Sequence, residues 1–180
     1  MAQTSQNIKF IRANADVIYR AFCNAKALES WLVPDNMTGK IHQFDWREGG
    51  GYQMSLFYHG HINHEGKTTN IEDRFITKLL TLKPAEEIVM SVRFDSDHPQ
   101  FKGDMILKIY FVSKAGGTEV RFYFEHIPVG IRPEDNETGT QQSLEKLALY
   151  VEQGKISMCD NNDEINEQDS DGSANAFQWK

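Results

Sequence analysis

Alternation of hydrophobic and polar residues dominates the middle of the chain and predicts β-strands there. One further alternating segment precedes them at residues 7–13. The segments of the middle region are 37–46, 51–61, 73–82, 86–95, 104–112 and 118–127. The last two are joined by SKAGG, a glycine-containing link of hairpin length. Links this short predict that neighbouring strands pair antiparallel.

Three other segments have the period of a helix. Residues 14–24 and 25–35 each predict a short helix, and Pro34 ends the second one. The clearest helical pattern begins near Thr140, and Gly154 ends it. Its apolar positions recur every three or four residues and form one stripe: Thr140, Leu144, Leu147, Ala148 and Val151.

The order of elements is one strand, two short helices, six strands and one long helix. This order predicts an α+β fold in which a curved, seven-stranded antiparallel sheet wraps around the final helix. Residues 1–154 form the predicted domain. Residues 155–180 are rich in Asn, Asp, Ser and Glu, which predicts a flexible acidic tail. The Phe-Gln-Trp at 177–179 leaves two interpretations open, a docking patch or a frayed terminus.

Charge separates the body of the chain from this tail. The formal net charge of the 180 residues is −7. Residues 155–180 hold six acids and two lysines, a net of −4, so residues 1–154 carry only −3. Nucleic-acid binding needs clustered Lys and Arg, so we expect no nucleic-acid partner. Aromatic residues make up 11% of the chain, enough to fill a core or line an apolar cavity.

Cysteine content and hydropathy bear on the compartment. The two cysteines, Cys23 and Cys159, are too few for a disulfide scaffold. The first ten residues lack the apolar core of a signal peptide, and no segment reaches the roughly 18 apolar residues of a membrane span. We therefore expect a cytoplasmic protein with reduced thiols.

Three consecutive glycines, Gly49 to Gly51, raise the question of a phosphate-binding loop. Such a loop is followed by a helix whose N-terminus meets the anion, usually with a Lys and a Ser or Thr. Here the glycines are followed by an alternating strand without that lysine. We interpret them as a sharp bend between strands, where glycine permits positive φ and close approach.

Several motifs in order resemble one known family. They are ADVIYRAFCNAKALESWLVPDNMTG, FDWREGGGYQMSL, GGTEVRFYFEHIP and a terminal helix ending LALYVE. Together they resemble the activators of heat shock protein 90 (Hsp90) ATPase and their homologues, in the START-like superfamily, also called SRPBCC or Bet v 1-like. The resemblance spans about residues 7–153 and does not extend to the tail.

The resemblance implies a helix-grip fold, in which the sheet holds the C-terminal helix with an apolar cavity between them. It implies binding of a small hydrophobic or amphipathic ligand in that cavity. Two alternatives stay open: a co-chaperone-like module that activates a heat-shock chaperone ATPase, and a cyclase-like or hydrolytic enzyme using the same cavity. One departure affects ligand preference, because relatives commonly have Gly-Trp where this chain has Gly139-Thr140.

Candidate site residues follow from the predicted inner face and the resemblance. The last strand places His126 on the face of Phe122 and Phe124, where it would orient a ligand oxygen or act as a base, or simply satisfy a backbone group. The expected cavity residues are Trp31, Trp46, Met54, Tyr58, Met90, Phe94, Tyr110, Phe124, His126, Thr140 and Leu144. Rings and methionines also fill ordinary cores, so spacing alone does not separate wall from core.

Motifs for metals and catalysis are weak or absent. His59 and His61 have His-x-His spacing and His64 follows, but the further ligands of a closed metal site are not placed. We expect neither a metal nor a cofactor, and no catalytic motif is visible, which favours a non-enzymatic role. The expected partner is a small hydrophobic molecule, with a chaperone as the alternative; the oligomeric state stays open, a homodimer included.

Overall fold

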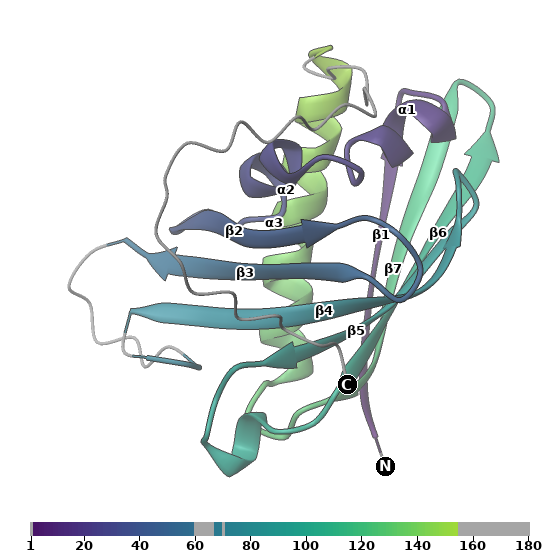
Figure 1. Ribbon diagram of the computed structural model, residues 1–180. Coiled ribbons are helices and arrows are strands. Elements are labelled where there is room, and N and C mark those ends of the chain that lie inside the picture. The colour runs from purple at the N-terminus through teal and green to yellow at the C-terminus, as the bar shows by residue number, and fades with distance from the viewer. Residues whose placement is uncertain (1, 60–66, 70, 155–180) are drawn as a thin grey trace.

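The computed structural model describes residues 2–59, 67–69 and 71–154. Its elements occur in the predicted order (Figure 1). They are β1 (Gln3–Ile11), α1 (Ala15–Arg20), α2 (Ala25–Trp31), β2 (Met37–Asp45), β3 (Gly51–Tyr58), β4 (Glu72–Lys83), β5 (Glu87–Phe94), a 3-10 turn (Pro99–Phe101), β6 (Met105–Lys114), β7 (Gly117–Ile127) and α3 (Pro133–Glu152).

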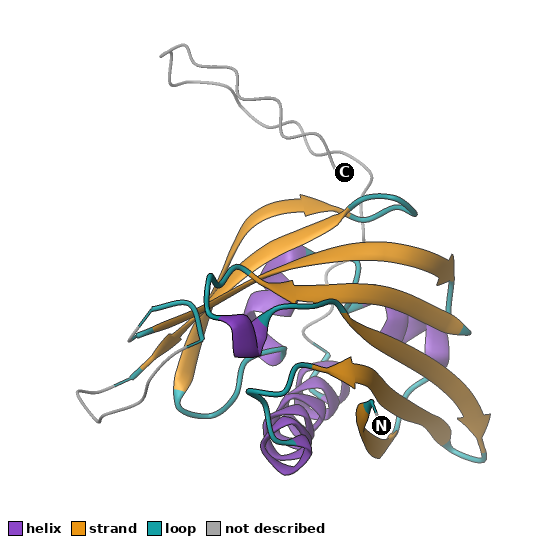
Figure 2. Cartoon of the chain, turned by 90° about the horizontal axis from the view of Figure 1, so that it is seen from below, coloured by secondary structure: helices purple, strands orange, loops and turns teal. Residues whose placement is uncertain are grey.

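The strands form one seven-stranded antiparallel sheet in the order β1-β7-β6-β5-β4-β3-β2. Every neighbouring pair from β2 to β7 is also consecutive in the chain, as the short links predicted. The sheet is strongly curved, and α3 lies beneath its arch with α1 and α2 near one end (Figures 1 and 2). The α+β helix-grip prediction is confirmed.

The core lies between the concave face of the sheet and the helices. Alternate residues of β5 and β6 point into it, so Met90, Leu107 and Ile109 are buried. From α3 the predicted stripe is buried: Thr140, Leu144, Leu147, Ala148 and Val151. The stripe faces the sheet because helical positions three and four residues apart share one side of a helix.

Glutamates on the helices cover the two edges of the sheet. The backbone N–H of Gln6 and that of Arg12 on the β1 side donate to Glu137 and Glu152 of α3, at 3.4 and 3.0 Å. At the opposite edge, the N–H of Ile41 in β2 donates to Glu29 Oε1 at 2.7 Å. These contacts occupy edge donors that would otherwise be free to pair with another chain.

The glycine run forms the turn from β2 into β3 and is followed by a strand, as interpreted from the sequence. Gly49 has a φ of +83°, which favours glycine. At Gly51 an added Cβ would lie 2.1 Å from the carbonyl oxygen of Thr77 in β4. The glycines therefore let the turn pass close to the neighbouring strand.

Replacing Glu29 with Ala tests whether the β2 edge contact stabilises the fold. Burial alone would raise the pKa of Glu29, but the Ile41 hydrogen bond and nearby lysines outweigh it and lower the pKa below its ordinary value of 4.5. The ionised carboxylate therefore stabilises the folded state above about pH 4.5. We expect Glu29→Ala to reduce the free energy of unfolding by about 1 kcal/mol at pH 7, measured by urea denaturation.

That loss should shrink as the pH falls through the lowered pKa, because protonation then removes the same interaction from the wild type. Lys26→Ala separates the two contributions, because it removes the ion pair with Glu29 at 3.5 Å but keeps the Ile41 hydrogen bond, so we expect a smaller loss. A Glu29→Ala effect that is zero, or the same at pH 3 and pH 7, would contradict this account.

Candidate functional site

A small space, partly open toward solvent, lies within the core beneath α2, and we call it the α2 void. Its volume is about 10 Å³, at the lower limit for one water molecule. Side chains from α2, the residues just after α1 and α2, the β2–β3 turn and four strands surround it. The walls are Phe22, Leu28, Trp31, Leu32, Trp46, Tyr52, Met90, Leu107, Ile109 and Phe122.

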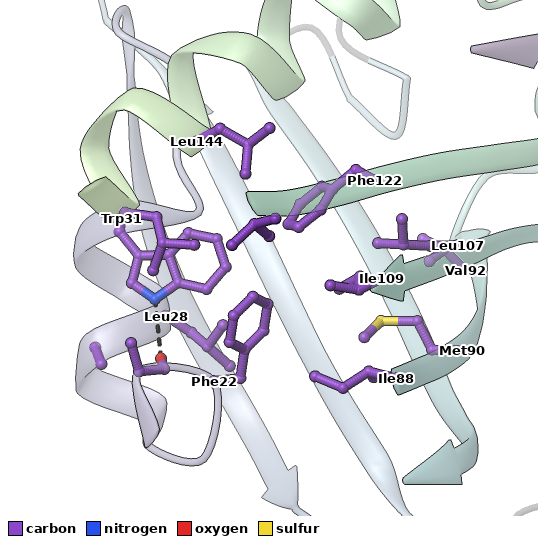
Figure 3. Close-up of a cluster of buried hydrophobic side chains, with 14 of the residues drawn as sticks. Phe22, Leu28, Trp31, Ile88, Met90, Val92, Leu107, Ile109, Phe122 and Leu144 are labelled. Atoms are coloured by element: carbon purple, nitrogen blue, oxygen red, sulfur yellow. Dashed lines mark hydrogen bonds between the residues drawn. The ribbon is translucent and has the colours of Figure 1, made fainter. Parts of the chain in front are cut away.

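The inner wall of the α2 void is fixed by aromatic packing (Figure 3). Phe22 and Trp31 meet edge to face, with ring centroids 4.7 Å apart. The indole N–H of Trp31 donates to the carbonyl oxygen of Ala21 at 2.9 Å, which leaves no unpaired polar group on this buried side chain. Phe22 also contacts Phe122 across the core, at a centroid distance of 6.3 Å. These contacts join the short helices to the sheet.

Tyr52 is a wall residue whose side chain ends in a hydroxyl group. Its side chain is buried, and its hydroxyl donates to the Met90 thioether sulfur at 3.9 Å. Sulfur is a weak acceptor, so this buried donor is poorly satisfied. Burial raises the pKa of Tyr52 well above its ordinary value. The group is therefore a neutral phenol at physiological pH.

The outer rim of the α2 void consists of half-buried side chains. Trp46 stacks on Phe44 with ring centroids 5.9 Å apart, and its indole N–H reaches the hydroxyl of Tyr19 over a long 3.3 Å. Leu32, just after α2, is also half-buried. Both rim residues are therefore partly exposed to solvent.

The α2 void differs in position and size from the expected hollow between the sheet and the C-terminal helix. No residue of α3 is among the walls of the α2 void, so Thr140 and Leu144 do not line it. Both are buried against the sheet, Leu144 completely. Ligand pockets typically have volumes of about 300–1,000 Å³, and the α2 void is far smaller. At the α2 void, the protein's own side chains fill almost all of the space.

Three of the expected cavity residues do come together around the α2 void: Trp31, Trp46 and Met90. Two others, Met54 and Phe124, are buried in the surrounding core but are not part of its walls. Met54 instead fills the space beside Gly39, where an added Cβ would lie 2.5 Å from its methyl group. The alternation in the sequence correctly predicted that Met54 and Phe124 lie on the inner face of the sheet. It could not predict which inner residues line the α2 void.

Two expected residues lie outside the grip. On β6 the buried positions are Met105, Leu107, Ile109 and Phe111, so Tyr110 points to the convex face. His126 is exposed and has a φ of +58°, within an irregularity of the β1–β7 pairing. This bulge interrupts the alternation that would have placed His126 beside Phe124. Neither side chain can orient a ligand inside the grip.

Tyr58 and Phe94 belong to a polar region at another end of the concave face. The hydroxyl of Tyr58 donates to Asp73 at 2.8 Å, and the ammonium group of Lys67 pairs with the same carboxylate. The Lys67 nitrogen also lies 5.2 Å from the centre of the Phe94 ring. These groups are paired with one another and do not contact the α2 void.

The histidine motif offers no metal site in the described part of the chain. His59 is exposed, and its backbone N–H donates to the Asn36 carbonyl oxygen. His61 and His64 lie outside the described residues. Among the residues described, no group of three or more His, Cys, Asp or Glu side chains is arranged to hold a metal ion.

Sequence analysis missed seven of the ten wall residues, among them Phe22, Tyr52 and Phe122. Tyr52 shares the inner face of β3 with Met54, and Phe122 shares that of β7 with Phe124. This shared face was the available signal. Which inner residue borders a void depends on how the side chains pack, and alternation carries no information about that.

Solved structures of similar proteins cover most of the chain. A Chromobacterium violaceum protein is 33% identical, with a TM-score of 0.74, and the match covers 83% of this chain and 96% of that one. An AHSA1-like protein from Aeromonas hydrophila shares the fold at 15% identity, with a TM-score of 0.63 and coverage of 89% and 99%. No curated protein matches the chain.

Within the described residues, no helix is long and apolar enough to cross a membrane. Residues 12–152 match the family described as activator of Hsp90 ATPase homolog 1-like protein. This match covers the body of the fold from the end of β1 to the end of α3. The chain belongs to the AHSA1-like family of the SRPBCC superfamily.

Proposed function

We propose that the protein binds a small apolar or amphipathic molecule in its core, at the α2 void. The observation that carries the proposal is the composition of its walls, which contain rings, aliphatic chains and one thioether but no charged side chain. Such walls favour an apolar guest, because binding removes the guest's surface from water.

The α2 void must expand to accept even a guest of one ring. Met90 is unbranched and has three rotatable bonds, so it can change shape without moving the backbone. Leu32 and Trp46 are half-buried at the rim and can shift outward. Binding then exchanges side-chain packing for contacts with the guest, and only a small molecule gains more than it displaces.

The direct test follows the indole N–H signals of Trp31 and Trp46 by NMR while the protein is titrated with indane, an uncharged apolar probe. The proposal expects saturable shifts of both signals, with the exposed Leu149 amide on α3 unmoved. Absence of any shift up to the solubility limit of indane, in the wild type and in the enlarged variant described next, would contradict it.

Met90→Ala should enlarge the α2 void and strengthen indane binding. Removing the buried thioether leaves space that the core refills only in part, so we expect a destabilisation of about 2–4 kcal/mol together with tighter binding. Denaturation gives the first quantity, and titration calorimetry gives the second.

Met54→Ala is the matched control, because Met54 is equally buried on the same concave face but does not line the α2 void. It should cost similar stability without improving indane binding. Equal gains in both variants would mean that any core cavity binds indane, and would contradict a specific site at the α2 void.

Of the two alternative functions, one loses the observation on which it depended and the other gains one. The cyclase-like alternative depended on a polar pair around His126 inside the grip, and His126 lies outside it. Docking to a chaperone finds support in two apolar side chains on the convex face of β1, Ile8 and Phe10, which are 52% and 43% exposed. We call these two residues the β1 patch.

Replacing both residues of the β1 patch with Ser tests that second function. If the protein stimulates a heat-shock chaperone ATPase through this face, Ile8→Ser/Phe10→Ser should abolish the stimulation and change stability by only about 1 kcal/mol, since both side chains are exposed. ATP hydrolysis rates measure the effect. Leu149→Ser, at an exposed position on α3, is the control. Unchanged stimulation by the double variant would exclude the β1 patch.

A further inference from the structure

The hydroxyl of Tyr52 stands out among the buried aromatic polar groups of the described core. The indole of Trp31 donates to a backbone carbonyl, and the hydroxyl of Tyr58 donates to a carboxylate. Both of these acceptors are strong. Tyr52, which is 3% exposed, has the Met90 sulfur at 3.9 Å instead.

The rest of Tyr52 is held firmly, so this weak contact does not reflect a loose residue. Its backbone N–H donates to the hydroxyl of Thr77 in β4 at 2.9 Å, and that hydroxyl donates back to the Tyr52 carbonyl oxygen at 3.1 Å. Its ring lies between those of Phe44 and Phe75, at centroid distances of 6.4 and 6.3 Å. The phenol is thus presented to the α2 void at a fixed position.

We propose that the Tyr52 hydroxyl is the recognition group of the α2 void and selects ligands that present a neutral carbonyl or ether oxygen on a small apolar frame. This inference rests on the proposed function. An oxygen acceptor would give the hydroxyl the strong partner that sulfur does not provide. The selection arises from a donor already fixed in place, so binding requires little ordering of the site.

The surroundings restrict the ligand further. No wall of the α2 void is a Lys, Arg or His, so a carboxylate would be buried without a cation beside it. A neutral oxygen avoids that cost. Since burial raises the pKa of Tyr52, its hydroxyl remains protonated between pH 6 and 9, and binding through it should not change over that range.

The test compares two probes that differ mainly in one oxygen, indane and 1-indanone, on the wild type and on Tyr52→Phe. Because the two probes partition differently from water, the informative quantity is the ratio of their dissociation constants in each protein. We expect this ratio to shift about tenfold toward indane in Tyr52→Phe, as titration calorimetry measures it. A ratio unchanged within twofold would overturn the inference.

Stability separates recognition from a structural role. Removing a poorly satisfied buried hydroxyl should leave the melting temperature of Tyr52→Phe unchanged or raised by a few degrees. Tyr58→Phe is the matched control, because it removes a donor from the buried Asp73 and should lower the melting temperature without changing the probe ratio. A fall of five degrees or more in Tyr52→Phe would make the hydroxyl structural and overturn the inference.

The two proposals fail in different ways. If neither probe binds to the wild type or to Met90→Ala, the proposed function fails and the inference falls with it. If indane binds but the ratio is the same with and without the hydroxyl, only the role of Tyr52 is overturned. An affinity for 1-indanone that changes between pH 6 and 9 while that for indane does not would also overturn it.

Discussion

Burial of the concave face of a single curved sheet is the constraint on which the other features of this protein depend. A sheet with one apolar face is stable only when another layer covers that face. Here α3 covers it along the side of β1, through Leu144, Leu147 and Val151. The opposite end is covered by the short helices, through Phe22, Leu28 and Trp31. One side of the sheet is thus covered by a single long helix and the other by two short helices. The α2 void lies beneath the short helices.

The dense packing around the α2 void has a consequence for the proposed binding. Protein cores are packed nearly as densely as organic crystals, and the α2 void is the size of one water molecule. Binding in this fold then competes with the protein's own side chains. If the proposal holds, Tyr52 would lower the cost of that competition, because its hydroxyl would lose only a weak sulfur contact when a guest replaces it. The proposed site would thus trade some stability of the empty protein for selectivity.

The fold could be predicted from the sequence because its determinants are local. The alternation in β5 and β6 and the stripe from Thr140 to Val151 are set by the periods of strand and helix, and the structure keeps both. Tyr110 was assigned to the wrong face because both faces of β6 are partly apolar, with Ile106 and Val112 on the same side as Tyr110. The prediction for His126 was wrong because a β-bulge in β7 turns its side chain out of the inner face, and the alternation in the sequence does not reveal such a bulge.

The candidate site could be predicted only in part. Trp31, Trp46 and Met90 were identified by residue type and inner-face position, and they do meet. The location of the α2 void was not predictable, because it depends on the fit of side chains from several elements to within the volume of a methyl group. The weak hydrogen bond of the Tyr52 hydroxyl could not be predicted either. The sequence does not show that a sulfur atom, and not an oxygen, lies next to this hydroxyl.

The most direct measurement of the central claim, that the core opens beneath α2, is a crystal structure determined under xenon pressure. Xenon enters apolar cavities without hydrogen bonding, so it reports on whether the walls can yield to a guest. We predict a xenon atom bordered by Trp31, Met90 and Phe122. Xenon bound elsewhere in the core, with the α2 void still closed, would contradict the account.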